Sequence, residues 1–238
     1  MDSTVPLDPD LMKLLKPDLD KTEAFLDTKL GAAAETLDSH GGPKHECPIF
    51  NLLCGSIAEA VRARGGVVDA VLHGLLDDKA GLKQGPITMR DVFQIVPYEN
   101  TIGVAEFNRD ELVEILEENA AFYSSGRFRG LWGLNLKLKI SAPDGKRIVF
   151  LSGPGGAAAR AQDRFHLACN SYDLASGGDK WKRLRQLADQ PEHHLVEYDF
   201  QTRDAVVEFV RKNSPLKIEH HDWWSLDSKR SSKTPQDP

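Results

Sequence analysis

The chain has 238 residues, of which 40% are hydrophobic and 28% are charged, so it can form one or two soluble domains with a real core. Its net charge of −6 argues against a general nucleic-acid-binding protein, because neutralising phosphates requires clustered Lys and Arg. No apolar run approaches the roughly 20 residues that span a membrane, so we expect neither nucleic acid nor a membrane as a partner.

The compartment is only weakly indicated by the sequence. The first ten residues lack the charged start and the apolar middle of a signal peptide. Three cysteines, Cys47, Cys54 and Cys169, do not make a disulfide framework, and an odd number favours a reducing compartment. These features favour the cytoplasm, but that inference fails if the chain is a domain whose signal peptide lay upstream.

The N-terminal part is predicted to be mainly helical. Residues 1–18 begin with a segment rich in Pro and Asp, and we interpret them as a lead-in or linker. Apolar residues recur at helical spacing over residues 11–37. A second helix is predicted over residues 50–64, with Leu53 and Ile57 on its buried side.

Two groups of residues in this part resemble fragments of metal sites. Asp38 and His40 form a D-x-H triplet, which opens the dimetal motif of metallophosphoesterases, whereas His45, Cys47 and Cys54 carry softer donor atoms. The other dimetal motifs, G-D-x-x-D, G-N-H-E and G-H-x-H, are absent from the sequence, and H-x-C-x6-C matches no usual zinc pattern. We therefore predict no metal site and no cofactor in this chain, with the triplet in a turn and Cys54 in the core.

The clearest local signals begin at residue 85. Thr88 and Asp91 have the spacing of a capping box, which predicts a short helix. This helix must end before Pro97, which cannot continue it. Tyr98 and Asn100 then lie on the turn that follows, where a rigid framework commonly displays binding groups.

Strands are predicted before and after this segment, and a further helix follows. We predict buried strands over residues 67–76 and 101–107. Asn108, with Glu111 three residues later, caps the next helix. An aromatic and an amide are therefore displayed between a helix and a strand.

The C-terminal half reads as a hairpin, a strand and two helices. The hairpin joins residues 134–141 and 147–151 through the turn Pro143-Asp144-Gly145, and a strand over residues 163–170 follows. A helix is predicted over residues 180–187, and Thr202 is predicted to cap a last one over residues 203–212. Trp223 and Trp224 could form an exposed partner site, but packing onto the domain is the preferred interpretation.

Together these elements predict an α+β fold. A mixed β-sheet flanked by helices would contain strands near Val67, Ile102, Leu134, Ile148 and Phe165. The main domain is predicted over residues 19–216. Residues 217–238 are predicted to form a C-terminal tail that is partly disordered.

Two motifs resemble the C-terminal domain of the 5'-nucleotidase family, which includes ecto-5'-nucleotidase and bacterial UDP-sugar hydrolase. The first follows the family pattern G-x-I-T-x-x-D-x5-P-F-x-N and the strand and helix after it, at positions Gly85, Ile87, Thr88, Asp91, Pro97, Tyr98, Asn100, Leu112, Leu116 and Glu117. The second, an aromatic followed by L-A-x-G-G-D, is found as Tyr172-Asp-Leu-Ala-Ser-Gly-Gly-Asp179. The resemblance covers about residues 19–187.

The resemblance implies a site that holds a nucleoside or a nucleotide. In that family the two motif aromatics stack on both faces of a nucleobase, and the motif Asp bonds the ribose hydroxyls. Carried over to this chain, the implied substrate-binding residues are Tyr98, Asn100, Tyr172, Gly177, Gly178 and Asp179. Base–aromatic stacking contributes roughly 1–3 kcal/mol per base.

Three positions depart from the family pattern. Counting back from Gly85, the Asn and the Arg of the family segment N-G-G-x-I-R fall on Val71 and Leu76, which cannot contact a phosphate in the same way. The family spacing also places the second aromatic at Asp173, one residue after Tyr172. Either the turn holds an extra residue and Tyr172 still reaches the base, or one wall of the clamp is lost.

Two functions therefore remain open. In the first, implied by the resemblance, the chain is the recognition domain of a 5'-nucleotidase-type metallophosphoesterase. Phosphate-ester hydrolysis and the divalent metals would then belong to an N-terminal catalytic domain that this chain lacks. In the second, the domain has lost recognition and acts as an interaction or homodimerisation module. A pocket formed by Tyr98, Asn100 and Asp179 would favour the first function, and a flat apolar patch at Trp223 the second.

Overall fold

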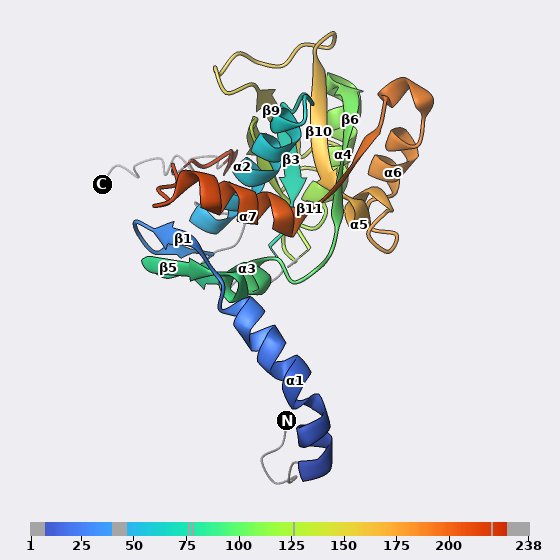
Figure 1. The fold of residues 1–238 in the computed structure, drawn as a ribbon. Helices are drawn as coiled ribbons and strands as arrows, with labels where there is room; N and C mark the ends of the chain where they lie inside the picture. The colour runs from blue at the N-terminus through green and yellow to red at the C-terminus, as the bar shows by residue number, and fades with distance from the viewer. Residues whose placement is uncertain are drawn as a thin grey trace, which may run out of the picture.

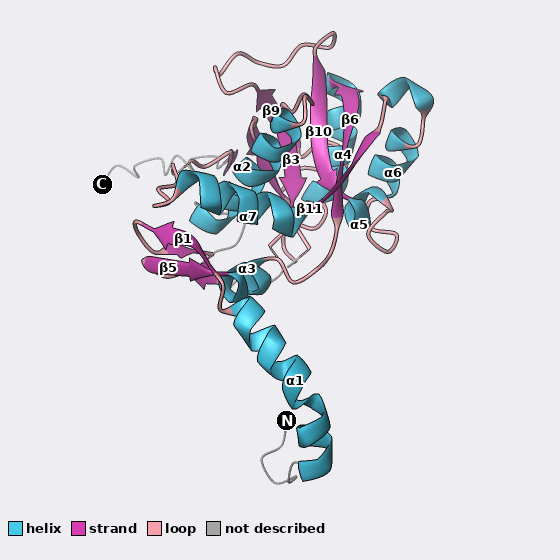
Figure 2. Ribbon diagram, in the orientation of Figure 1, coloured by secondary structure: helices cyan, strands magenta, loops and turns pink. Residues whose placement is uncertain are grey.

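A five-stranded mixed sheet forms the centre of the protein. The computed structural model describes residues 8–39, 47–75, 77, 79–125, 127–219 and 221–227. The strands of the sheet lie in the order β11-β6-β10-β3-β7 (Figure 2). They are β3 (Ala70–His73), β6 (Thr101–Asn108), β7 (Gly130–Trp132), β10 (Arg164–Asn170) and β11 (Val196–Gln201). β10 runs parallel to β3, and the other neighbouring strands are antiparallel.

Both faces of this sheet are buried, because successive side chains of a strand point to opposite faces. Ile102 and Val104 of β6 belong to one hydrophobic core, whereas Ala105 and Phe107 belong to the other. In β3 the same alternation places Val71 in the first core and Leu72 in the second. The sheet therefore separates two cores, each covered by its own set of helices.

Helices lie on both faces of this sheet (Figure 1). The first face packs against α2 (Pro48–Ala63), α3 (Met89–Ile95) and α7 (Thr202–Asn213). The second packs against α4 (Arg109–Ala120), α5 (Ser171–Leu174) and α6 (Lys182–Ala188). Within the described part of the chain, no helix is sufficiently long and apolar to cross a bilayer.

Smaller sheets complete the fold. A three-stranded sheet joins β12 (Trp224–Leu226), β8 (Asn135–Leu138) and β9 (Ile148–Ser152), in the order β12-β8-β9. Two pairs, β1 (Lys29–Ala33) with β5 (Gly85–Thr88) and β2 (Leu37–Asp38) with β4 (Gly81–Leu82), are antiparallel. The α+β class is confirmed, but the prediction that Leu134 and Ile148 mark strands of the main sheet is wrong, since their hairpin belongs to the three-stranded sheet.

The predicted helix over residues 11–37 is wrong in its second half. The structure has α1 over Pro9–Leu26 and then the strand β1. Within β1, Leu30 and Ala33 are buried, and its register with β5 is fixed by pairs such as Ala32 with Pro86. The pairing with a strand more than fifty residues away overrides the local helical pattern.

α1 contributes nothing to either core. None of its residues is buried, and the helix extends away from the rest of the structure (Figure 1). Its contacts are made by its C-terminal end, where Phe25 packs edge-on against Phe93 and Arg90 of α3 pairs with Glu23 and Asp27. The predicted domain limits of 1–18, 19–216 and 217–238 stay predictions. The limit at residue 18 falls inside α1, and β12 of the predicted tail pairs with β8.

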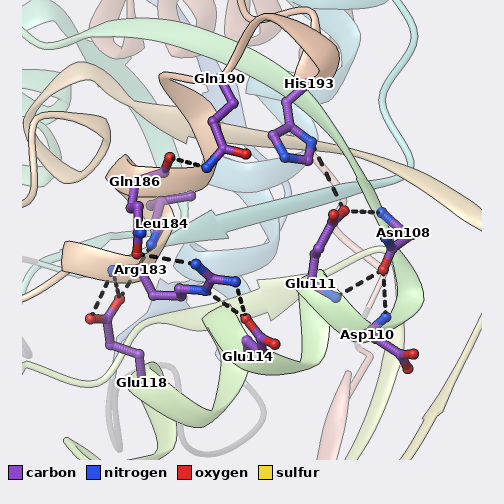
Figure 3. A network of polar contacts seen from close by, with 10 residues as sticks. All are labelled: Asn108, Asp110, Glu111, Glu114, Glu118, Arg183, Leu184, Gln186, Gln190 and His193. Atoms are coloured by element: carbon purple, nitrogen blue, oxygen red, sulfur yellow. Dashed lines mark hydrogen bonds and ion pairs between the residues drawn. The ribbon is translucent and has the colours of Figure 1, made fainter.

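A polar network fastens α4 to α6 and to the 3-10 helix η2 (Pro191–His193) (Figure 3). Asn108 and Glu111 form the capping box that the sequence predicts for α4. Glu118 of α4 accepts a hydrogen bond from the Arg183 backbone N–H at 3.1 Å, and the Arg183 guanidinium pairs with a second α4 carboxylate. α7 differs slightly from the prediction, because its cap is Gln201 and not Thr202.

Candidate functional site

Four strands of the central sheet bring their polar ends to the same edge. β3 and β10 are parallel and both finish at this edge, at His73 and Asn170. β6 and β7 are antiparallel to these neighbours, so both begin there, next to Asn100 and Arg129. The topology therefore gathers segments that are far apart in the sequence.

A pocket of about 390 Å³ lies at this edge. Such a volume is within the range of small-molecule sites. The residues that line it come from strand ends and the loops beside them: His73, Gly74, Tyr98, Asn100, Arg127, Arg129, Asn170, Tyr172 and Lys180. Its composition combines two aromatic rings, two side-chain amides and several basic groups.

Tyr98, Asn100 and Tyr172 are the predicted site residues that line this pocket. The side chains of Tyr98 and Tyr172 are 58% and 45% exposed, so both rings present surface that a ligand could cover. Gly177, Gly178 and Asp179 do not line the pocket. The structure thus brings together half of the predicted set and leaves the G-G-D turn outside the cavity.

The turn that carries Tyr98 and Asn100 is fixed by α7. Arg203 is buried, and its guanidinium donates hydrogen bonds to the carbonyl oxygens of Val96 at 3.1 Å and Pro97 at 3.0 Å. The backbone N–H of Thr202 donates to the Asn100 carbonyl at 2.9 Å. These bonds satisfy the carbonyls of a turn that has no strand partner, which holds Tyr98 in place beside the pocket.

Tyr172 lies on the short helix α5 and lines the pocket. Asn170 caps this short helix by accepting a hydrogen bond from the Asp173 N–H at 2.8 Å. Asp173, which the family spacing would make the aromatic, points inward and is 1% exposed. Tyr172 points to the pocket and donates a hydrogen bond from its hydroxyl to the Gly177 carbonyl at 3.1 Å.

The G-G-D turn has a clear structural role. Ser176, Gly177, Gly178 and Asp179 all have positive φ angles, a conformation that favours glycine. A Cβ atom on Gly177 would lie 2.5 Å from Cδ1 of Trp181, which is fully buried. The glycines therefore allow the chain to pass over Trp181 on its way into α6, which is the structural alternative to a direct binding role.

Arg129 and Asp173 form a buried ion pair behind the pocket wall. Nε and Nη2 of Arg129 donate to the two carboxylate oxygens of Asp173, each at 2.9 Å. Asn170 Nδ2 donates a further bond to this carboxylate at 3.0 Å. Two parallel bonds of this kind set the orientation of both groups, so the pair holds α5 against the start of β7.

His73 is the residue that sequence reasoning missed at the end of β3. It is 6% exposed, and its Nδ1 lies 2.7 Å from the Gly74 carbonyl, so Nδ1 carries the hydrogen and donates. Its Nε2 is then a buried acceptor with no partner among the described residues. Burial lowers the pKa of His73 below its ordinary value of 6.5, which keeps the ring neutral at neutral pH.

Val71, where the family spacing would place the amide, does not line the pocket. Val71 is fully buried in the middle of β3 and faces the core under α2 and α7. The strand β3 ends at His73, and the short strand β4, which pairs with β2, lies between it and Gly85. Leu76, the expected position of the family Arg, lies outside the described residues.

The two candidate metal sites around Asp38 and Cys54 lie only partly within the described residues. Among the described residues, no group of three or more His, Cys, Asp or Glu side chains is arranged to hold a metal ion. Asp38, predicted to lie in a turn, belongs to β2, while His40 and His45 lie outside the described residues. Cys54 is fully buried, and burial raises the pKa of Cys47 to about 11, so both are protonated core thiols at neutral pH.

Trp223 packs onto its own domain. Its Nε1 donates a hydrogen bond to Asn51 Oδ1 at 2.9 Å, and its ring lies 5.4 Å from that of Trp132. Trp224 packs in turn against Tyr123 and Phe128. These contacts match the preferred interpretation of the two tryptophans, in which they cover the core.

Comparisons with known proteins agree with these features. The family model described as "5'-nucleotidase, C-terminal domain" matches residues 26–186. The chain is 25% identical over 171 residues to the trifunctional nucleotide phosphoesterase protein YfkN of Bacillus subtilis, and these residues are 69% of this chain and 11% of that protein. It is 26% identical over 166 residues to a probable 5'-nucleotidase of Treponema pallidum, which are 62% of this chain and 28% of that protein.

Solved structures show the same fold. The crystal structure of a 5'-nucleotidase precursor from Thermus thermophilus superposes with a TM-score of 0.76 at 19% identity, covering 93% of this chain and 44% of that one. The chain thus spans less than half the length of each of these three relatives. The residues matched by the family model run from the last residue of α1 into α6.

Proposed function

Because the chain belongs to the family of 5'-nucleotidase C-terminal domains, we propose that it recognises a nucleoside or a nucleotide. The observation that supports this proposal is the pocket at the edge of the central sheet. Two exposed tyrosines, Tyr98 and Tyr172, line it together with the amide of Asn100. Aromatic rings offer stacking surface to any base, and an amide can donate and accept at a base edge.

Hydrolysis of a phosphate ester would take place outside these residues. The chain spans 11% and 28% of the length of the two curated relatives, which leaves room in proteins of this kind for a separate catalytic domain. We assign the divalent metals to such an N-terminal metallophosphoesterase domain, which would be the partner of this one. The recognition domain would supply the base contacts and present the phosphate ester to the metals.

An interaction or homodimerisation module is the less favoured function. It would be supported by a flat apolar patch at Trp223, but that ring packs against Trp132 and bonds Asn51. The proposal of nucleotide recognition rests instead on exposed aromatic rings inside a cavity. If the domain had lost nucleotide recognition, the exposure of the Tyr98 and Tyr172 rings in the pocket would have no functional explanation.

The test is a calorimetric titration of the chain with adenosine and AMP, repeated on Tyr98→Ala. Loss of one stacking ring should weaken binding by roughly 5- to 150-fold, which corresponds to 1–3 kcal/mol. The matched control is Phe150→Ala, an exposed aromatic on β9 that does not line the pocket. Absence of heat with any nucleoside or nucleotide would contradict the proposal, and the mass of the protein in solution would then test for a dimer.

A further inference from the structure

Selective binding of a ribose requires an acceptor for its two neighbouring hydroxyl groups. An ionised carboxylate suits this purpose best, because it accepts from two donors at once and its hydrogen bonds are charge-assisted. Among the described residues, no aspartate or glutamate lines the pocket at the edge of the central sheet. A sugar in this pocket therefore meets no carboxylate in the wall.

Asp179 is the carboxylate to which the resemblance assigns the ribose, but it is exposed and does not line the pocket. Its backbone N–H donates to the Ser176 hydroxyl at 3.2 Å, and its φ angle is 66°. The next two N–H groups, those of Lys180 and Trp181, donate to the Ser176 carbonyl at 2.8 and 2.9 Å. Because Trp181 is fully buried, the turn is anchored to the core and the Asp179 backbone is fixed outside the cavity wall.

Asp173 is a second carboxylate close to the pocket, and it is already committed to the wall. Its side chain is 1% exposed and accepts hydrogen bonds from Arg129 and Asn170. The Asn170 amide is committed as well, because its Oδ1 accepts from the Asp173 N–H at 2.8 Å while its Nδ2 donates to the Asp173 carboxylate. These two side chains hold each other in place and do not turn to a sugar.

The other acceptors of the pocket wall are uncharged. The Asn100 amide is one of them, and the proposed function places it at the base edge. His73 Nε2 is another, but it is buried beneath its neighbours. Hydrogen bonds to a charged acceptor are roughly twice as strong as those to a neutral one, so these groups give little discrimination between ribose and deoxyribose.

We propose that the pocket recognises the base and does not read the sugar hydroxyls, so that it binds ribonucleosides and deoxyribonucleosides alike. This inference rests on the proposed function and adds the class of sugar. It makes Asp179 a residue of the turn before α6, in place of the ribose contact that the resemblance implies. The stacking surface of Tyr98 and Tyr172 is the same for both kinds of nucleoside.

The experiment measures the affinity of the chain for adenosine, 2'-deoxyadenosine and 2',3'-dideoxyadenosine by calorimetry. The variants are Asp179→Asn and Tyr98→Ala. Asn removes the charge of Asp179 and tolerates its left-handed backbone conformation, so the turn is kept. Asp144→Asn is the matched control, because Asp144 is an exposed aspartate of another turn and does not line the pocket.

We expect the three ligands to bind the wild type within about twofold of one another, whereas a carboxylate that bound the two hydroxyls would favour adenosine by at least about tenfold. Asp179→Asn and Asp144→Asn should leave all three affinities unchanged. Tyr98→Ala should weaken all three by the same factor, because the stacking ring contacts the base and not the sugar.

Two outcomes would overturn the inference and leave the proposed function intact. A strong preference for adenosine that is lost in Asp179→Asn would show that Asp179 reaches the sugar in the bound state. The same preference retained in Asp179→Asn would show that another group reads the hydroxyls. Failure of all three ligands to bind would overturn the proposed function itself, and the inference with it.

Discussion

Asp173 stands where the family spacing would place the second motif aromatic, but in the structure it is a buried carboxylate. Its carboxylate is 1% exposed and accepts three hydrogen bonds, two from Arg129 and one from Asn170. We predict that Asp173→Ala lowers the free energy of unfolding by about 3–5 kcal/mol, because the Arg129 charge would remain buried without a partner. Urea denaturation, followed by circular dichroism, measures this change.

The control for Asp173 is Asp20→Ala on α1, which removes an exposed ion pair with Lys16. Exposed pairs of this kind contribute about 0–1 kcal/mol. The double variant Arg129→Met/Asp173→Leu should lose less stability than Asp173→Ala, since it removes both buried charges. Similar losses for Asp173→Ala and Asp20→Ala would contradict the idea that the uncompensated charge decides the effect.

His73 should make the stability of the domain depend on pH. Burial lowers its pKa in the folded state, so below about pH 6.5 the unfolded chain binds more protons than the folded one. Stability should therefore be fully present above pH 6.5 and fall as the pH drops, with a slope of at most about 1.4 kcal/mol per pH unit for one proton. The nearby charges oppose each other, since Asp173 raises this pKa and Arg129 lowers it.

The measurement is the free energy of unfolding of the wild type and of His73→Asn between pH 5 and pH 7.5. The difference between the two proteins isolates His73 from the other titrating groups. His194→Asn is the control, because His194 is exposed and its left-handed backbone conformation suits Asn. Parallel pH curves for the wild type and His73→Asn would contradict the prediction.

At the scale of elements, the structure follows the sequence where signals are local. The capping boxes of α3 and α4 lie at Thr88 with Asp91 and at Asn108 with Glu111, as predicted. The end of α1 could not be predicted, because β1 exists through its pairing with β5. The same applies to β7 and β12, which have three residues each and depend on β3 and β8.

In the candidate pocket, too, residues with local sequence signals could be predicted, and residues brought together by strand pairing could not. Tyr98, Asn100 and Tyr172 carry motif signals that are visible in the sequence alone. His73 and Arg129 carry none, because they meet only when the parallel pair β3 and β10 and the antiparallel strand β7 bring their ends to the same edge. Counting back from Gly85 leads to Val71, which is buried. A residue count alone does not show which strand ends meet at the pocket.

At the scale of the whole molecule, recognition and hydrolysis are expected to be separate. A two-metal phosphoesterase needs clustered carboxylates and imidazoles to hold both cations. The motifs G-D-x-x-D, G-N-H-E and G-H-x-H are absent from the 238 residues, and the described residues contain no cluster arranged for a metal ion. The pocket is lined instead by aromatic rings, amides, one imidazole and basic groups, with no carboxylate among its lining residues.

We therefore predict that the purified chain releases no phosphate from AMP in the presence of added manganese, while binding AMP in the calorimeter. The assay measures free phosphate over time at several protein concentrations, with an added phosphatase as the positive control. Tyr98→Ala should weaken binding and leave the phosphate signal at the background level, because the stacking ring contributes to recognition alone. Phosphate release that rises in proportion to the chain and stops with a chelator would show that these residues build a catalytic metal site, and would overturn the separation of recognition from hydrolysis.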